Sequence, residues 1–152
     1  MATFNGTEGN DSISGTTDND TIFGNAGNDW IEGRGGNDTL SGGGGQDSYV
    51  FREYGAANAD TLANFDTNWD ALRFDSSAFT ALGGPGHFAA NDARFYAAPG
   101  AAGGHDADDR FVYNTSTGQL YYDADGSGAG DAQLVATVQG APAVAANDIW
   151  VI

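Results

Sequence analysis

The first fifty residues alternate between polar, glycine-rich runs of six residues and triplets whose central residue is apolar. The pattern repeats every nine residues, as GTEGNDSIS, GTTDNDTIF, GNAGNDWIE, GRGGNDTLS and GGGGQDSYV. Each triplet resembles a short strand with one buried face, which predicts five strands with inward side chains at Ile13, Ile22, Ile31, Leu40 and Tyr49. Each six-residue run predicts a tight turn, because glycine tolerates the positive φ of a sharp reversal.

A nine-residue unit cannot bury its single apolar side chain alone, so we expect the units to stack as a solenoid. Two units would make one flattened coil, which places units n and n+2 on the same edge, about 4.8 Å apart. Five aspartates then form two columns, with members Asp11, Asp20, Asp29, Asp38 and Asp47. Neighbouring carboxylates at this spacing repel by roughly 3 to 4 kcal/mol per pair at an effective dielectric near 20. The stack therefore needs a cation between its turns.

The residue types favour calcium as that cation. Turn carbonyls and paired carboxylates supply the roughly six to eight oxygens that Ca²⁺ prefers, whereas Mg²⁺ requires a tighter octahedron. Zinc and copper favour His or Cys, but the chain has no Cys, and His87 and His105 lie outside the repeats. In the alternative interpretation, each aspartate only caps its own turn by accepting backbone hydrogen bonds. Five repeats in phase favour calcium over that alternative.

The units resemble the nonapeptide GGxGxDxUx of the RTX, or haemolysin-type calcium-binding, proteins of Gram-negative bacteria. The stretch GQDSYVF to ADTLANFDTNWDALRFDSSAF resembles the segment after the repeats in serralysin-type C-terminal domains. The stretch DADDRFVYNTSTGQLYYDADGSGAGDAQLVATV and the final NDIWVI resemble the tail of many RTX proteins, and residues 80–105 match least. The resemblance implies an all-β fold. It consists of a calcium-bound parallel β-roll, a right-handed solenoid, in residues 1–52, capped by a C-terminal β-rich region of hairpin or sandwich type in residues 53–152.

The resemblance also implies the ligands, which are the position-six aspartates and the backbone carbonyls of positions one, two and four in turns n and n+2. The first site would contain Gly9, Asp11, Gly24, Asn25, Gly27 and Asp29. The second would contain Asp18, Asp20, Gly33, Gly36 and Asp38, and the third Gly27, Asp29, Gly42, Gly45 and Asp47. Asp60 matches a residue that closes the roll in related domains. Because Thr16, Thr17 and Asp18 depart from the consensus, we expect a looser second site, and about three or more Ca²⁺ ions in all.

Composition and charge bear on the compartment and the partners. The chain has 21 acidic residues against five Lys and Arg, a formal net charge of -16, which excludes direct binding to nucleic acid or anionic lipid. No apolar run is long enough to span a bilayer, and the polar start predicts no cleavable signal peptide. The resemblance implies secretion by a type I machinery that reads an uncleaved C-terminal signal. Residues 148–152 fit that signal, and they also fit a final strand with Trp150 in the core.

The remaining segments predict short strands and turns. Phe111–Tyr113 and Gln119–Tyr122 predict a hairpin, Gln133–Gln139 predicts a strand, and brief helical pieces are expected around Ser76–Leu82 or Ala89–Arg94.

Two further acidic clusters are interpreted as turns. The DxDG motif at Asp123 and Asp125, with Asp131 beyond it, lacks the closing Glu of an EF-hand, which favours a hairpin turn over a metal site. The group of Asp106, Asp108 and Asp109 beside His105 is interpreted as a solvated loop.

The sequence contains no HExxH, no GxSxG, no Cys nucleophile and no phosphate loop, so we expect a module without catalytic residues. The expected function is to stay unfolded in low calcium and to fold on extracellular Ca²⁺ after type I secretion from a Gram-negative bacterium. Folding would then stabilise a secreted protein, with an N-terminal effector domain in a longer parent chain. The alternative is an adhesion or polysaccharide-binding module that uses the calcium roll as scaffold and residues 80–110 as its contact surface.

Overall fold

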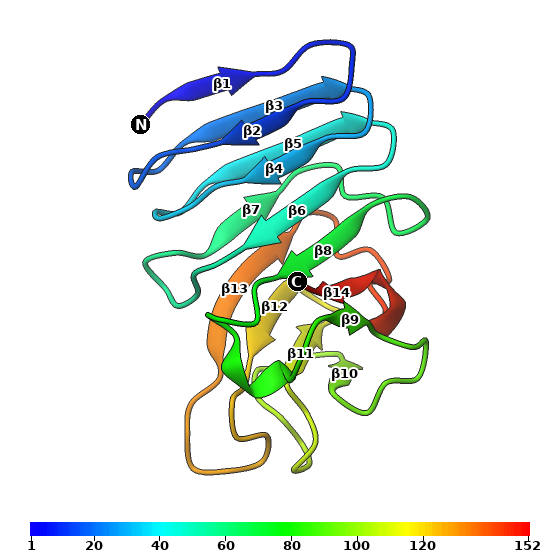
Figure 1. Cartoon of the computed structure of the whole chain (residues 1–152). Coiled ribbons are helices and arrows are strands. Elements are labelled where there is room, and N and C mark those ends of the chain that lie inside the picture. Colours follow the sequence, from blue (N-terminus) through cyan, green and yellow to red (C-terminus); the bar gives the residue numbers. More distant parts are fainter.

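The computed structural model describes all 152 residues, and nearly all of its regular structure is strand, in two sheets (Figure 1). The eight-stranded sheet consists, in spatial order, of β1 (Thr3–Asn5), β3 (Thr21–Ala26), β5 (Thr39–Gly44), β7 (Asp60–Leu62), β13 (Gln133–Val138), β12 (Gln119–Tyr122), β11 (Phe111–Asn114) and β10 (Phe95–Ala98). The six-stranded sheet consists of β2 (Ser12–Ser14), β4 (Trp30–Glu32), β6 (Ser48–Phe51), β8 (Ala71–Phe74), β14 (Ile149–Val151) and β9 (Gly86–His87). The all-β prediction is confirmed.

The strands β1 to β8 alternate between the two sheets, so that two strands and two turns make one coil (Figure 1). Within each sheet neighbouring coils are parallel, with Ile22 opposite Leu40 and Ile31 opposite Tyr49. These four side chains are fully buried, whereas Ile13 at the uncovered end is only half-buried. The expected stack of paired nonapeptide units, a β-roll, is therefore confirmed. Its core has one apolar side chain per strand up to β5, whereas β6 buries Tyr49, Val50 and Phe51.

Both sheets continue past the repeats into the C-terminal region. The strands β7 and β8 add a further coil, and then β13 pairs in parallel with β7 while β14 pairs in parallel with β8. The antiparallel hairpin of β11 and β12 forms as expected. One cluster of 23 buried residues extends from the roll into this region. The boundary at residue 52 stays a prediction, because the sheets and the core run across it.

Aromatic side chains fill the wider, C-terminal end of the core. The rings of Phe74 and Phe111 lie 4.3 Å apart between centroids, and Phe79 and Tyr122 meet edge to face at 5.0 Å. Such pairs each add about 0.5–1.5 kcal/mol beyond area burial. The C-terminal region thus covers the end of the narrow roll with a denser apolar core.

Helical structure is limited to two 3-10 turns, at Thr80–Leu82 and Ala146–Asp148. The first falls within the expected piece at residues 76–82. The prediction of helix at Ala89–Arg94 is wrong, because Asp92 accepts a hydrogen bond from the backbone N–H of Arg94 at 3.0 Å and from its guanidinium. Such local side-chain bonds favour turns over helix. None of the helical segments has the length and apolarity needed to cross a membrane.

Candidate metal centre

The turns between the two sheets stack in two columns, one on each edge of the roll. Column one consists of the turns that lead into the six-stranded sheet; these turns end at Asp11, Asp29, Asp47 and Asp70. Column two comprises the turns that lead into the eight-stranded sheet, which end at Asp20, Asp38 and Asp60. The last residue of every turn is therefore an aspartate next to a buried strand.

The carboxylates in each column form a hydrogen-bonded series, which we call the aspartate ladder. From the second member of each column onward, Oδ1 accepts a hydrogen bond from the backbone N–H of the aspartate in the coil before it, and Oδ1 of Asp20 accepts from the N–H of Ala2 at 2.6 Å. In column one the donor–acceptor pairs are Asp11 to Asp29 at 2.8 Å, Asp29 to Asp47 at 3.0 Å, and Asp47 to Asp70 at 2.9 Å. In column two they are Asp20 to Asp38 at 2.7 Å and Asp38 to Asp60 at 3.0 Å. One oxygen of each carboxylate thus holds adjacent coils in register.

The second oxygen of the first two aspartates is satisfied within its own turn. Oδ2 of Asp11 accepts hydrogen bonds from the backbone N–H and the hydroxyl of Thr7, at 2.6 and 2.9 Å. Oδ2 of Asp20 does the same with Thr16, at 2.7 and 2.6 Å. The hydroxyl of Thr16 holds the pKa of Asp20 below its ordinary value, with further backbone hydrogen bonds contributing. In these two turns the carboxylate acts as a turn cap.

The next three aspartates differ, because the Oδ2 atoms of Asp29, Asp38 and Asp47 are buried without any hydrogen-bond partner. Their turns have no threonine at position two. That position is occupied by Asn25, Arg34 or Gly43, all with positive φ, at 81°, 68° and 105°. A buried carboxylate oxygen with no partner is costly. These three oxygens therefore require a ligand that hydrogen bonds within the protein do not supply.

Glycine at position one leaves room beside each of these oxygens. A Cβ atom on Gly24 would collide with Oδ2 of Asp29 and lie 2.5 Å from the carbonyl oxygen of Gly42. A Cβ atom on Gly33 would collide with Oδ2 of Asp38 and lie 3.1 Å from Oδ2 of Asp60. Carbonyl and carboxylate oxygens thus converge on spaces from which side chains are excluded. A donor set made only of oxygen fits a hard cation, and its number and flexibility fit Ca²⁺.

Burial also opposes the charged state of the deeper carboxylates. Desolvation raises the pKa of Asp38 to about 6 and the pKa of Asp60 to about 8, and the neighbouring carboxylates of the ladder add to both shifts. Desolvation likewise raises the pKa of Asp47, and raises that of Asp70 to about 6. A cation among these groups would favour their ionised form, so binding would release protons.

The structure brings together the residues of each predicted site. The three predicted turn pairs are residues 6–11 with 24–29, 15–20 with 33–38, and 24–29 with 42–47. The first two pairs each contain one unpartnered oxygen, and the third contains two, those of Asp29 and Asp47. The turns pack closely, because a Cβ atom on Gly27 would lie 2.7 Å from the carbonyl oxygen of Gly9. The Asp18 carboxylate, in contrast, points into solvent, which leaves its backbone carbonyl as the available donor. Ligation at all these residues stays a prediction.

Asp60 and Asp70 extend the ladder beyond the five repeats. Asp60 is buried, and its Oδ1 accepts the N–H of Asp38, while its expected role in closing the roll stays a prediction. Asp70 was missed in the sequence, although the triplet Asp70-Ala71-Leu72 has the aspartate–any–apolar pattern of the repeats. The signal was obscured because Asp70 follows Asp47 by 23 residues instead of 18.

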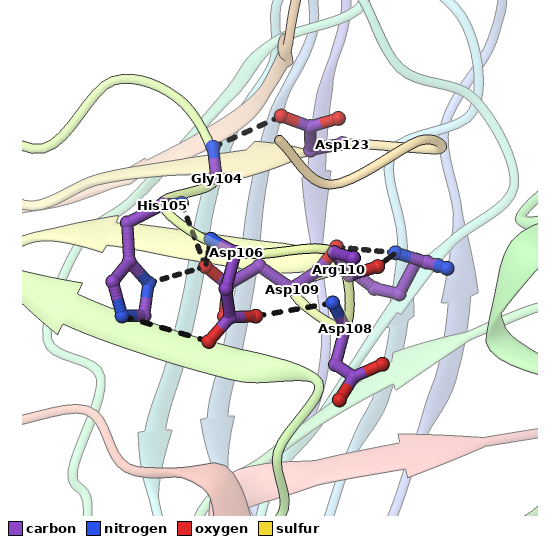
Figure 2. Close-up of polar contacts among 8 residues, drawn as sticks. Gly104, His105, Asp106, Asp108, Asp109, Arg110 and Asp123 are labelled. Atoms are coloured by element: carbon purple, nitrogen blue, oxygen red, sulfur yellow. Dashed lines mark hydrogen bonds and ion pairs between the residues drawn. The ribbon is translucent and has the colours of Figure 1, made fainter. Parts of the chain in front are cut away.

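Figure 2 shows a second acidic cluster, in which His105 lies beside Asp106 and Asp109. Oδ2 of Asp109 accepts backbone N–H bonds from His105 at 2.8 Å and Asp106 at 3.1 Å, and Nδ1 of His105 lies 2.6 Å from it. Oδ2 of Asp123, from the neighbouring loop, accepts from Gly104 at 3.0 Å. No buried oxygen of this cluster lacks a partner. The contacts are those of a hydrogen-bonded loop, unlike those of the ladder.

Comparison with known proteins agrees with this geometry. The family model of the RTX calcium-binding nonapeptide repeat (4 copies) matches residues 3–27 and 14–49. No curated protein gives a significant match. The solution structure of the AlgE6R3 subunit of the mannuronan C5-epimerase from Azotobacter vinelandii is similar, with 27% sequence identity and a TM-score of 0.58. The alignment covers 97% of this chain and 77% of that chain, so the likeness includes the C-terminal region. Residues 3–49 therefore match the RTX calcium-binding nonapeptide repeat, and the likeness to the solved structure extends to the rest of the chain.

Proposed function

We propose that this chain is a calcium-triggered folding module of a secreted protein. It stays unfolded in low calcium and folds when it binds extracellular Ca²⁺ after type I secretion, and the folded module stabilises the protein to which it belongs. The observation that carries the proposal is the set of buried, unpartnered Oδ2 atoms of Asp29, Asp38 and Asp47. They occur only in the turns whose position two lacks a threonine.

The stability of the folded chain differs with and without the cation. Without it, burial raises the pKa of Asp38 and Asp60, so at neutral pH the ladder must either bind protons or hold desolvated charge. With it, at about 1 mM free calcium and dissociation constants of about 10⁻⁴ to 10⁻³ M, each occupied site stabilises the fold by about 0.4–1.4 kcal/mol. Three such sites contribute roughly 1–4 kcal/mol, against the stability of a typical domain at about 5–15 kcal/mol. Calcium at three sites therefore shifts the folding equilibrium roughly 10- to 1,000-fold, which decides whether a chain near its folding midpoint folds.

The ions would lie in the three turn pairs described above, with the unpartnered carboxylates as their charged ligands and the turn carbonyls completing the set. Calcium supplies positive charge and flexible oxygen coordination. The chain sets the register of the coils, because Oδ1 of each of these aspartates holds the preceding coil while its Oδ2 stays free to serve as a ligand. Dissociation constants of about 10⁻⁴ to 10⁻³ M, as in other extracellular modules, would separate cytosolic from extracellular calcium.

The proposed secretion route is supported by the C-terminus. In the folded chain Ile149–Val151 forms β14 between β8 and β9. A signal in residues 148–152 would be accessible to an exporter only while this strand is unpaired. Keeping the chain unfolded in low calcium would therefore keep the signal readable, and folding outside would hide it.

The proposal is tested by a calcium titration followed by far-UV circular dichroism, starting in EDTA and repeated with Mg²⁺. We expect a cooperative transition from coil to strand in millimolar calcium and none with Mg²⁺ at the same concentration. The triple variant D29N/D38N/D47N should lose the response to calcium. A strand spectrum that is already present in EDTA and indifferent to calcium would refute the proposal.

The polysaccharide-binding alternative receives support from one comparison, since the similar solved structure belongs to an enzyme named for mannuronan. The contact surface expected at residues 80–110 is not favoured. That segment has no large exposed hydrophobic side chain, because Phe88 is buried and the Tyr96 ring stacks on His105 at 3.9 Å. An exposed aromatic side chain in a groove lies elsewhere, on column one.

A further inference from the structure

A groove of about 450 Å³ opens where column one meets the C-terminal region. Its walls are the turns that end at Asp47 and Asp70 and the start of β14. The volume falls within the roughly 300–1,000 Å³ typical of small-ligand sites. The lining is mainly polar and includes Trp69, which is 60% exposed, and Trp150.

Trp69 is held on a well-ordered turn. The backbone N–H groups of Trp69 and Asp70 both donate to the carbonyl oxygen of Asp66, at 3.1 and 2.8 Å. The Asp66 carboxylate in turn accepts from Asn68 at 2.9 Å, and the Asp66 N–H donates to Oδ2 of Asp70. The turn thus fixes the backbone that carries a large apolar ring at the surface of a polar groove, although burying the ring would be favourable. An exposed aromatic ring on a fixed backbone is a suitable platform for a ligand with one apolar face.

The opposite wall is a stacked row of side chains on the outer face of the six-stranded sheet. The Arg73 guanidinium lies 5.4 Å from the Trp30 ring centroid and 5.1 Å from that of Trp150. The His87 ring stacks on Trp150 at 4.1 Å. Two restraints fix the guanidinium plane of Arg73: the stacking on the two rings, and the hydrogen bond that its Nε donates to Oγ of Ser48 at 2.9 Å. Both Nη atoms of Arg73 lack a partner in the protein and remain available to donate.

Planar polar side chains with unused hydrogen-bonding capacity complete the lining. The side-chain amides of Gln46 and Asn147 make no hydrogen bond within the chain, and the Asn28 amide uses only its oxygen, which accepts from the backbone N–H of Gln46 at 2.9 Å. Side-chain amides can donate and accept in a fixed plane, and a guanidinium can donate in one. Such groups form paired hydrogen bonds with the vicinal hydroxyls of a sugar. A pyranose ring also has an apolar C–H face, which can stack on an aromatic ring such as that of Trp69.

We propose that this groove binds a neutral hexopyranose glycan, with one sugar ring stacked on Trp69 and its hydroxyls bonded to Arg73 and the amides of Gln46 and Asn147. The charge of the groove selects a neutral glycan over an acidic one. Apart from Asp47, whose charge the proposed calcium would offset, its lining contains the carboxylates of Asp70 and Asp148 against Arg73 as the permanent cation. The chain's formal charge of -16 also stays negative with three Ca²⁺ ions bound. A polyuronate would be repelled.

The inference depends on the calcium-folding proposal only because the turns that line the groove must be folded. The test is isothermal titration calorimetry in calcium-saturated buffer, after circular dichroism has confirmed a folded chain. The probes are cellohexaose and maltohexaose as neutral oligomers and a mannuronate hexamer as the acidic one. We expect a neutral oligomer to bind with a dissociation constant at or below about 1 mM, and the mannuronate hexamer to bind more weakly or not at all.

Three variants examine the site. Trp69→Ala and Asn147→Ala, both outside the aspartate ladder, should weaken binding of the neutral oligomer, Trp69→Ala by at least about tenfold, or 1.4 kcal/mol. The matched control is Phe23→Ala, because Phe23 is 39% exposed on the eight-stranded sheet, away from the groove. The inference is overturned if neither neutral oligomer binds, if Trp69→Ala binds as the wild type does, or if only the mannuronate hexamer binds. Loss of the calcium-dependent spectrum would instead count against the folding proposal.

Discussion

Replacing Asp38 with asparagine should change the stability of the folded chain in opposite directions with and without calcium. Asparagine keeps an oxygen that can accept the Asp20 N–H, but it removes the negative charge of the side chain. In EDTA the ionised Asp38 destabilises the fold, because its pKa is raised from 3.8 to about 6 by burial. That difference corresponds to at most about 3 kcal/mol at a pH well above 6. The variant should therefore be more stable than the wild type in EDTA by up to about this amount.

In calcium the same substitution removes a charged ligand. Loss of even an outer-shell partner typically weakens a metal site roughly 10–100-fold, so we expect the calcium midpoint of folding to rise at least about tenfold. The assay is circular dichroism in two series, a trimethylamine N-oxide titration in EDTA and a calcium titration. Asp18→Asn is the matched control, since it removes the same charge from a carboxylate that is 76% exposed. The reasoning is refuted if Asp38→Asn and Asp18→Asn behave alike in either series.

Three further predictions follow from the ladder and its turns. In EDTA the stability of the folded chain should fall as pH rises from about 4 to about 8, because Asp60, with a pKa of about 8, keeps a proton that the unfolded chain releases. The trimethylamine N-oxide concentration needed for half-folding should therefore rise over this range, and a fall would contradict the prediction. Gly45→Ala should lower the free energy of unfolding in calcium by at least about 1–2 kcal/mol, because Gly45 has φ 129° and a Cβ there would overlap Gly27. The control is Gly44→Ala, which has open space around it and should change the free energy of unfolding by less than about 1 kcal/mol. Urea titration in calcium measures both. Asp70→Ala should cost about 1–3 kcal/mol in calcium, since the buried N–H of Asp47 loses its acceptor, and an unchanged melting temperature would argue against this role.

The roll could be predicted from the sequence because its unit is short and strictly periodic. Each apolar residue, such as Ile22 or Leu40, has one inward position to occupy, and glycine at fixed positions leaves few alternatives for the turn. The pairing of units n and n+2 follows from that geometry. The registers of the C-terminal strands could not be predicted in this way. The pairing of β13 with β7 and of β14 with β8 joins segments that are far apart in the sequence and share no repeat.

The candidate site shows the same limit. The aspartate columns were evident from spacing. Whether a carboxylate is capped or unpartnered depends on position two of its turn, which is a threonine in the first two turns (Thr7 and Thr16) and a residue with positive φ in the next three. The spacing alone leaves turn capping and cation binding as alternatives, and the structure has capping at both of the first two turns. Asp70 was missed because the longer turn before it breaks the nine-residue period. The groove beside Trp69 could not be foreseen, because its walls come from three separate segments.

The hydrogen bonds of the aspartate ladder all run in one direction, since each carboxylate receives the N–H of the coil before it and none receives the N–H of the coil after it. A second series runs the opposite way at position five, where Oδ1 of Asn10, Asn19 and Asn28 accepts the N–H of the coil after it, at 2.8 to 2.9 Å. Each inner coil is therefore bonded to both neighbours, and either end of the roll presents donors as well as acceptors. The two ends differ instead in apolar cover, since the core continues into the C-terminal region while Ile13 at the N-terminal end is only half-buried. Growth should therefore start at the dense C-terminal core, and roll length can vary by adding or deleting coils at the open end while the starting point of folding stays unchanged.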